Sequence, residues 1–437
     1  MARFRDTVSS MVPWIKRSGV SRLLVTYGLG QPKATPRNYT ALSKEGYQMN
    51  AIVFRCVNLI AGSASTVPLR LKMKDTDEVI DSHPILDLLA RPNVKDRNWA
   101  NLVMQAVAFR LLSGNTYFEG TESKIRSKSP PLEIFTHRPD RMKVVPGPHG
   151  LPEKFVYAIG SNKREWAVNP VDGSGPILHI KRFNPLDDWY GMSPIEAAAM
   201  GIDAHNDANR WNTSQLQNSG KPSMALVYTP REGLAALTRE QYDRTKKWIK
   251  EEFEGPDNAG KPMVIGGNFD FKTLSLTPQE MEWLKGKQDA AREISLAFDV
   301  PEQLVGIEGS QKFDNFEHAI LALWDYAVCP NLNAVVGELG DWLLPQYDGT
   351  EGMVLEANYD DVPALGPRRR EIAASLKDKA HLTINEKREA EGKEPYPGGD
   401  VILIPATSVP LTASGQPAST EDDPNDQTRA VRLAYGD

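Results

Sequence analysis

Cysteine and long apolar runs are both scarce in this 437-residue chain, and each scarcity excludes a class of protein. The only cysteines are Cys56 and Cys329, too few for a disulfide framework, so a reducing compartment is expected. No run approaches the roughly 20 apolar residues that cross a bilayer, and residues 1–17 lack the apolar stretch of a signal peptide. We therefore expect neither secretion nor a membrane partner.

Motifs of nucleotide and metal enzymes are also missing. Lys221 and Lys261 each follow a glycine, but neither lies in the glycine-spaced loop that cradles phosphates. His205 and His318 have no histidine four residues on, so each is expected to be a surface residue or a satisfied core residue rather than a metal ligand. We expect no cofactor and no enzymatic activity. The alternative left open is a metal-dependent nuclease that uses Asp360 and Asp361.

Charge is unevenly distributed along the chain, whose net value is −6. Residues 1–45 hold eight basic and two acidic residues, a net of +6, which leaves −12 on the remainder. A globally basic nucleic-acid binder is therefore disfavoured. The basic arm could contact nucleic acid or an acidic partner, or it could be a solvated terminus. Residues 1–47 lack periodicity and are predicted to be flexible.

Residues 48–192 show mixed periodicity that predicts an α+β unit. A helix is expected from Asn50 to the stop signal Val67-Pro68, and others at 83–89 and 98–112. Alternating segments separated by Pro/Gly turns predict the strands 69–73, 116–119, 132–135, 142–145, 155–157 and 177–180.

Two capping boxes mark the starts of two long helices. Ser193-Pro194-Ile195-Glu196 and Thr277-Pro278-Gln279-Glu280 each place proline at the first helical position, and they predict helices over 193–219 and 277–301. The first helix is apolar at its start and polar on nearly all sides from His205 onward. Such a helix is expected to bridge solvent or to lie against neighbouring chains, and not in its own core.

Residues 220–276 between these helices predict a compact β-α-β insert, with a strand at 224–228, a helix from the capping box Thr238–Gln241 to Gly255 and strand residues between 262 and 276. A loop is expected at 302–315. Residues 316–363 predict a long helix kinked at Pro330 and a strand at 353–357 that returns to the first unit. Short helices are expected within 364–404, and residues 405–437 are predicted to be disordered.

Seven segments, in order, resemble the HK97-like portal proteins of tailed bacteriophages. They are the helix at 50–61, Val67-Pro68-Leu69, His83 to Asn93, Leu112 to Tyr117 with its Gly-Asn turn, Tyr190-Gly191-Met192-Ser193-Pro194-Ile195, Phe298 to Gly306 and Thr383 to Arg388. One departure is Gly309–Asn315, a short polar version of the family's variable loop.

The resemblance implies an α+β portal fold and a closed ring of about twelve copies at a capsid vertex, around a channel for double-stranded DNA. It implies a wing over 48–192, a two-helix stem at 193–219 and 277–301, a clip at 220–276, a tunnel loop at 302–315 and a crown at 364–404. Implied partners are the terminase large subunit, the major capsid protein or scaffold, and a head–tail adaptor. Assembly is expected in the host bacterial cytoplasm, and the finished ring belongs to the virion.

Site residues follow from the same resemblance, with helical periodicity as a guide. The tunnel loop is expected to contact DNA through Gly309, Ser310, Gln311, Lys312 and Phe313. The channel face of the second stem helix is assigned to Lys285, Gln288, Asp289 and Arg292. The docking surface of the clip is assigned to Arg244, Lys247, Glu251 and Glu254.

Residues 277–312 carry seven acidic and four basic residues, a net of −3. An acidic lining would avoid phosphate ion pairs and let DNA slide. The alternatives are another phage head or neck protein without a DNA channel, and the nuclease. Mg²⁺-dependent DNA cleavage that is lost in Asp361→Asn would favour the nuclease.

Lys312 is predicted to make weak contacts with the DNA backbone, together with Gln311 and Ser310. Lys312→Ala particles should therefore package or retain less DNA than particles with the unchanged chain, because one cation per copy is lost. The DNA content of purified particles checks this, and equal content would contradict it.

Overall fold

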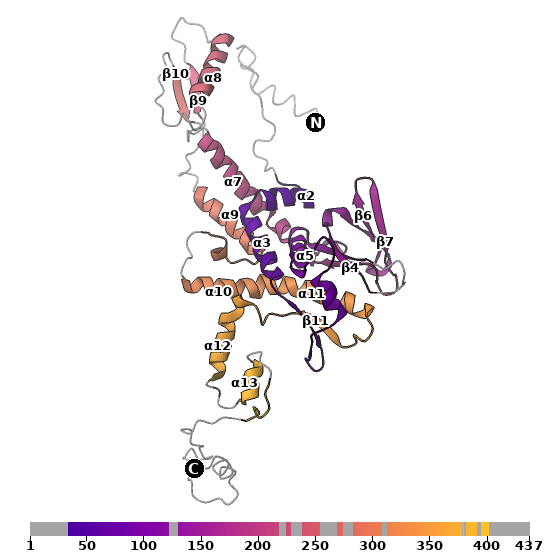
Figure 1. Cartoon of the computed structure of the whole chain (residues 1–437). Coiled ribbons are helices and arrows are strands. Elements are labelled where there is room, and N and C mark those ends of the chain that lie inside the picture. Colours follow the sequence, from indigo (N-terminus) through magenta and orange to yellow (C-terminus); the bar gives the residue numbers. More distant parts are fainter. Residues whose placement is uncertain are drawn as a thin grey trace, which may run out of the picture.

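The computed structural model describes residues 34–121, 130–217, 224–228, 238–253, 269–273, 283–307, 313–377, 379, 382–390 and 395–401. The described elements form an elongated molecule (Figure 1). A mixed body lies in the middle, α7 (Ala199–Gln217) and α9 (Trp283–Ala297) project from it on one side, and α12 (Gly366–Lys377) and α13 (Ile384–Ala390) lie on the other. The α+β class predicted from sequence is confirmed.

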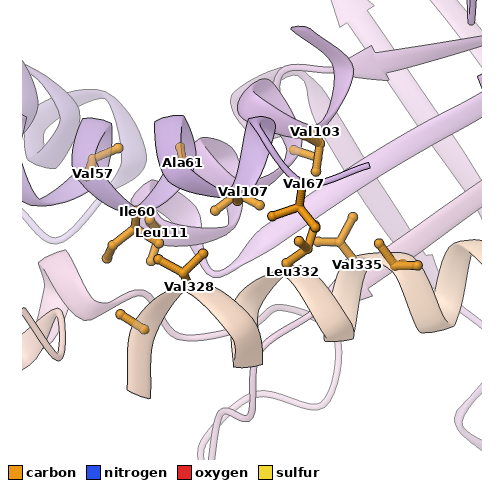
Figure 2. Close-up of a cluster of buried hydrophobic side chains, with 14 of the residues drawn as sticks. Val57, Ile60, Ala61, Val67, Val103, Val107, Leu111, Val328, Leu332 and Val335 are labelled. Atoms are coloured by element: carbon orange, nitrogen blue, oxygen red, sulfur yellow. The ribbon is translucent and has the colours of Figure 1, made fainter. Parts of the chain in front are cut away.

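The core of the body forms where three helices meet, α3 (Ala51–Ser65), α5 (Trp99–Ser113) and α11 (Cys329–Leu343). Figure 2 shows α3 and α5 directing their apolar side chains at α11. The labelled side chains are Val57, Ile60, Ala61, Val67, Val103, Val107, Leu111, Val328, Leu332 and Val335. The labelled residues of α5 lie four positions apart, and Val57 and Ile60 of α3 lie three apart, so each set lies on one face of its helix. Each fully buried Val, Leu or Ile contributes about 1.5–3 kcal/mol to folding.

A three-stranded antiparallel sheet of order β11-β1-β2 joins an early and a late segment of the chain within the body. Its strands are β1 (Leu69–Met73), β2 (Val79–Ile80) and β11 (Met353–Ala357), and Leu71 pairs with Leu355. The helix α4 (Pro84–Ala90) follows β2. The predicted return of the strand at 353–357 is confirmed, while the two-residue β2 was not predicted because it is too short to show alternation.

Two further antiparallel sheets, of order β4-β3-β8 and β5-β6-β7, complete the body. The strands are β3 (Asn115–Thr121), β4 (Glu133–His137), β5 (Met142–Pro146), β6 (Pro152–Ile159), β7 (Asn162–Ala167) and β8 (Ile177–Lys181). Tyr117, Phe155 and Trp166 share a second apolar cluster. The buried Glu119 carboxylate of β3 pairs with Arg164 of β7 at 2.6 Å, which ties the two sheets together. β7 was not predicted because its polar side chains mask the strand.

The helix predicted from 316 to 344 is present in three parts. These are α10 (Phe313–Leu323), a π-helical turn η7 (Trp324–Val328) and α11. Pro330 has no N–H for the usual bond to the fourth residue before it, and the wider turn precedes it directly. The kink expected at Pro330 therefore takes the form of a π-helical turn.

One stretch of the described chain, Phe316–Gln346, is long and apolar enough to cross a bilayer by length and composition. The expectation that no segment qualifies was wrong on that criterion. Half of its most apolar window is buried inside the protein, which is typical of a core helix.

Short helices complete the described chain. They are α2 (Tyr39–Leu42), the π-helix η2 (Ser43–Gln48), α6 (Pro194–Ala197), and the 3-10 turns at Pro139–Arg141, Pro148–Gly150, Glu302–Leu304, Leu344–Gln346 and Pro363–Leu365. The 15-residue helix α8 (Arg239–Phe253) belongs to the insert. The strands β9 (Met224–Tyr228) and β10 (Phe269–Thr273) pair antiparallel beside α8 (Figure 1). Residues 1–33, part of the insert and the tail predicted at 405–437 lie outside the described residues.

Two expectations about boundaries were wrong. Regular structure begins before residue 48, because α2 and η2 lie within residues 39–48, Thr35 donates its backbone N–H to Asp203 at 2.8 Å and Gly46 lies against Ile195. These are single polar and close-packed contacts, and they leave no periodic pattern in the sequence. The helix predicted over 193–219 is also interrupted at Ala198, where α6 ends and α7 begins.

Two glycines bring distant segments of the body into backbone contact. Gly114 has φ +75°, and a Cβ on Gly191 would lie 2.2 Å from its carbonyl oxygen. Asn115 Oδ1 accepts the Gly191 N–H at 2.8 Å, and Gly114 O accepts the Arg182 N–H at 2.8 Å. The Gly-Asn turn at 114–115 is thereby joined to the segment that leads into α6 and α7.

Gly191→Ala should lower the free energy of unfolding by about 3 kcal/mol, because the added methyl group meets rigid backbone on two sides. Gly337→Ala is the matched control, since a Cβ at this position inside α11 meets nothing within 4 Å. It should raise stability by up to about 1 kcal/mol. Urea unfolding measures both, and equal values for the two variants would contradict the contact.

Candidate functional site

The projecting helices α7 and α9 pack side by side (Figure 1). Gly201 of α7 faces α9, and a Cβ on it would lie 3.2 Å from Glu293 Oε2 and 3.5 Å from the Ala290 carbonyl oxygen. Ala290 and Ala291 of α9 are buried. Small residues on both helices thus allow their backbones to approach closely.

Asn50 joins α7 to the body through a buried polar network. Its Oδ1 caps α3 by accepting the N–H groups of Ile52 and Val53 at 3.0 and 3.2 Å. Its Nδ2 lies 3.1 Å from His205 Nδ1 and donates to Asn206 Oδ1 at 3.0 Å. Asn206 in turn donates to the Glu45 carbonyl at 2.7 Å. One side chain thereby connects the start of α3 with the middle of α7.

The expectation that α7 buries no polar face in its own chain was therefore wrong. Asn50, His205 and Asn206 are each at most 5% exposed, and their polar atoms satisfy one another. Burial lowers the pKa of His205, and the charge of Lys287 lowers it further. The neutral ring can then accept at Nδ1 from the amide groups of Asn50 and Asn209. His205 is a satisfied core residue, one of the two outcomes predicted for it.

Three charged groups meet near the end of α9, two on the helix and one in the turn Glu302–Leu304 that follows it. Arg292 lies 3.0 Å from Asp289 and 2.8 Å from Glu302, so one cation is shared by two carboxylates. Lys285 is exposed and Gln288 is half-buried. Of the four residues assigned to the channel face, the structure pairs Asp289 with Arg292. That this face lines a channel stays a prediction.

Other predicted site residues are only partly described. Arg244 and Lys247 are exposed on α8, whose capping box forms as predicted through Thr238 and Gln241. The Glu251 side chain and all of Glu254 lie outside the described residues. So do Gly309, Ser310, Gln311 and Lys312, while Phe313 opens α10 and its side chain is not described.

The two aspartates of the nuclease alternative take part in structural contacts. Asp360 pairs with Arg70 at 2.6 Å, and Arg70 also pairs with Glu356 on β11 at 2.5 Å. Asp361 accepts from Asn358 at 3.0 Å. Within the described ranges, no group of three or more metal-ligating side chains gathers here or elsewhere. Asp360 therefore helps to hold Arg70 of β1 beside β11, which is a structural role.

Sequence reasoning missed the role of Asn50 and the contact between Gly114 and Gly191. A signal existed for the first, because an asparagine before an apolar helix is a frequent N-cap. Its second set of partners lies more than 150 residues away, and no local pattern shows them.

A family model described as phage portal protein matches residues 51–392 of the chain. The portal protein of Enterobacteria phage HK97 is 24% identical over 393 residues, which cover 86% of this chain and 86% of that protein.

Two similar solved structures come from gene transfer agent (GTA) particles. A chain in the neck of the native particle, computed with C12 symmetry, is 36% identical with a TM-score of 0.63. A chain in the neck of the empty particle, computed with C6 symmetry, is 37% identical with a TM-score of 0.65. Each match covers 84% of this chain and 96% of that chain.

Asn50→Ala should lower the free energy of unfolding by about 2–4 kcal/mol, because it removes the cap of α3 and leaves buried polar atoms of α7 unpaired. Asn98→Ala is the control. Asn98 caps α5, which has 15 residues like α3. Its side chain is exposed and accepts only the Asn101 N–H among the described residues. It should cost about 1 kcal/mol. Chemical unfolding measures both, and equal losses would contradict a role at the junction.

Proposed function

The chain belongs to the phage portal protein family, and we propose that it is one copy of a closed ring at a capsid vertex. The central channel of this ring carries double-stranded DNA during packaging and ejection. The ring comprises about twelve copies, which places equivalent surfaces of neighbouring copies in contact around the axis.

The observation that carries this proposal is the match to a subunit of a particle neck computed with C12 symmetry. It extends over 84% of this chain at 36% identity, so it is not confined to one motif. A neck is part of a particle, which supports a position at the capsid vertex.

The charges on α9 support a channel that does not hold DNA tightly. Asp289 and Arg292 on α9 and Glu302 in the turn that follows it together carry one net negative charge, and the arginine is held by both carboxylates. The exposed Lys285 on the same assigned face brings the four groups to a net charge of zero. A cation already paired in this way has little to gain from a DNA phosphate. Because tight binding of DNA depends on releasing counterions from its phosphates, a lining of this kind leaves the duplex free to slide.

The parts of the subunit have distinct roles in this proposal. Residues 193–219 and 277–301 form the stem, and residues 220–276 form the clip that docks the terminase large subunit and later a head–tail adaptor. The exposed Arg244 and Lys247 of α8 belong to that docking surface. The wing at 48–192 faces the major capsid protein or scaffold, residues 302–315 form the tunnel loop, and residues 364–404 form the crown. Assembly takes place in the host cytoplasm.

Asp289→Lys should reduce the DNA packaged per particle several-fold at low salt. The amount of packaged DNA should recover at higher salt. The change adds two positive charges to every copy, frees Arg292 from one carboxylate and creates phosphate contacts that slow the duplex. Nuclease-protected DNA per particle measures the effect.

Glu165→Lys is the control for Asp289→Lys. It makes the same charge change on β7 of the body, where Glu165 is 48% exposed and paired with Lys154. Its packaging should match that of the unchanged chain. Equal packaging by both variants at low salt would contradict a channel-facing α9.

A further inference from the structure

Two arginines of the body converge on one neutral amide. Arg110 lies in the last turn of α5, Arg182 follows β8 directly, and both guanidinium groups donate to Oδ1 of Asn331 at the start of α11. The Arg182 bond is 3.1 Å long. Asn331 is 6% exposed, and its Nδ2 donates to the Ala327 carbonyl at 2.7 Å, which fixes Oδ1 toward the two cations.

No carboxylate of the described chain is bonded directly to either cation of this pair. Arg70 and Arg164 are bonded to carboxylates at 2.5 and 2.6 Å. In the described part of the chain, no carboxylate oxygen lies within ion-pair distance of Arg110 or Arg182, and Arg110 Nε is buried with no acceptor. The carboxylates of Glu338 and Asp299 act on Arg110 and Arg182 respectively, but only from beyond that distance. Burial and the charge of Arg182 together lower the pKa of Arg110 to about 10, and the carboxylate of Glu338 offsets part of this effect. Half-buried like charges that share one neutral acceptor are costly unless an anion joins them.

Large apolar side chains that are exposed to water follow Arg182 directly in the chain. The loop that follows Arg182 exposes Phe183 by 87% and Leu186 by 95%. This loop is fixed, because Asn184 Oδ1 accepts the Leu186 N–H at 3.0 Å and Asp187 Oδ1 accepts the Trp189 and Tyr190 N–H groups. Exposed aromatic and aliphatic groups next to arginine are the composition of a protein interface.

We propose that Arg110, Arg182 and Asn331 form half of an ionic site, completed in the ring by an aspartate or glutamate of the neighbouring copy. Phe183 and Leu186 supply the apolar contact beside it. The inference rests on the proposed ring, which brings an identical chain to every copy. That chain carries a net −12 outside residues 1–45, so carboxylates are abundant on its surface. A planar guanidinium pair also fits a carboxylate, which can accept from both groups at once.

Arg182→Met tests the site in the full-length chain. The ring–subunit equilibrium is followed by mass photometry over a range of protein and NaCl concentrations, and thermal unfolding is followed on dissociated subunits. The concentration for half-assembly should rise at least tenfold and depend less on salt. The unfolding midpoint of the subunit should hold or rise, because the repulsion between the two guanidinium groups is relieved. Arg182→Lys should restore most of the assembly.

Arg138→Met is the matched control, because Arg138 is 50% exposed and pairs with Asp140 in its own chain. It should leave assembly unchanged. If Arg182→Met assembles like this control, or destabilises subunit and ring alike, the ionic site is wrong. If the unmodified chain forms no ring at any concentration, the proposed function and the inference that rests on it both fall.

A free inorganic anion is the rival occupant, and phosphate distinguishes it. At constant ionic strength, phosphate should not raise the unfolding midpoint of isolated subunits. A rise in the unchanged chain that is lost in Arg182→Met would overturn the inference in favour of an anion site. In a high-resolution structure of the ring, a carboxylate oxygen of the neighbouring copy should lie within about 4 Å of the guanidinium groups.

Discussion

The placement of the projecting helices depends on one buried asparagine. Asn50 caps α3 with its carbonyl oxygen and holds His205 and Asn206 of α7 with its amide nitrogen. Because every one of these polar groups is removed from water, a shift of α7 against the body would leave several of them unpaired, each at a cost of about 1–3 kcal/mol. The network therefore sets the direction of α7, to which α9 and the β9–β10 pair with α8 are connected.

Periodicity was sufficient to predict much of the body, because α3, β1 and β11 each bury apolar residues in a pattern that the sequence shows. Capping boxes predicted the starts of α6 and α8, because the bonds that form them join residues three positions apart in the sequence. The contacts that position these elements could not be predicted. Gly114 meets Gly191, and Arg110 meets Arg182, across 70 or more residues of chain, and each of these residues is unremarkable in its own neighbourhood. The candidate channel face was predicted by spacing alone, and the structure adds that Arg292 is neutralised there.

The two arginine sites of the subunit differ in a way that suits a ring. On α9, Arg292 is satisfied by Asp289 and Glu302 of its own chain and offers little to a passing phosphate. In the body, Arg110 and Arg182 both donate to the neutral Asn331, no carboxylate of the described residues lies within ion-pair distance of them, and exposed apolar side chains follow Arg182 in the chain. A surface meant for a moving duplex would be neutralised within the subunit, whereas a surface meant for a permanent neighbour can leave its charge for that neighbour to complete.

The central claim is that this chain closes into a ring around an open axis. A rotationally averaged electron micrograph of the assembled full-length protein tests it most directly. The account predicts end-on views with cyclic symmetry of about twelve copies and an axial hole wide enough for a DNA duplex, roughly 20 Å across. Assemblies without cyclic symmetry, or rings whose axis is filled by protein, would contradict it.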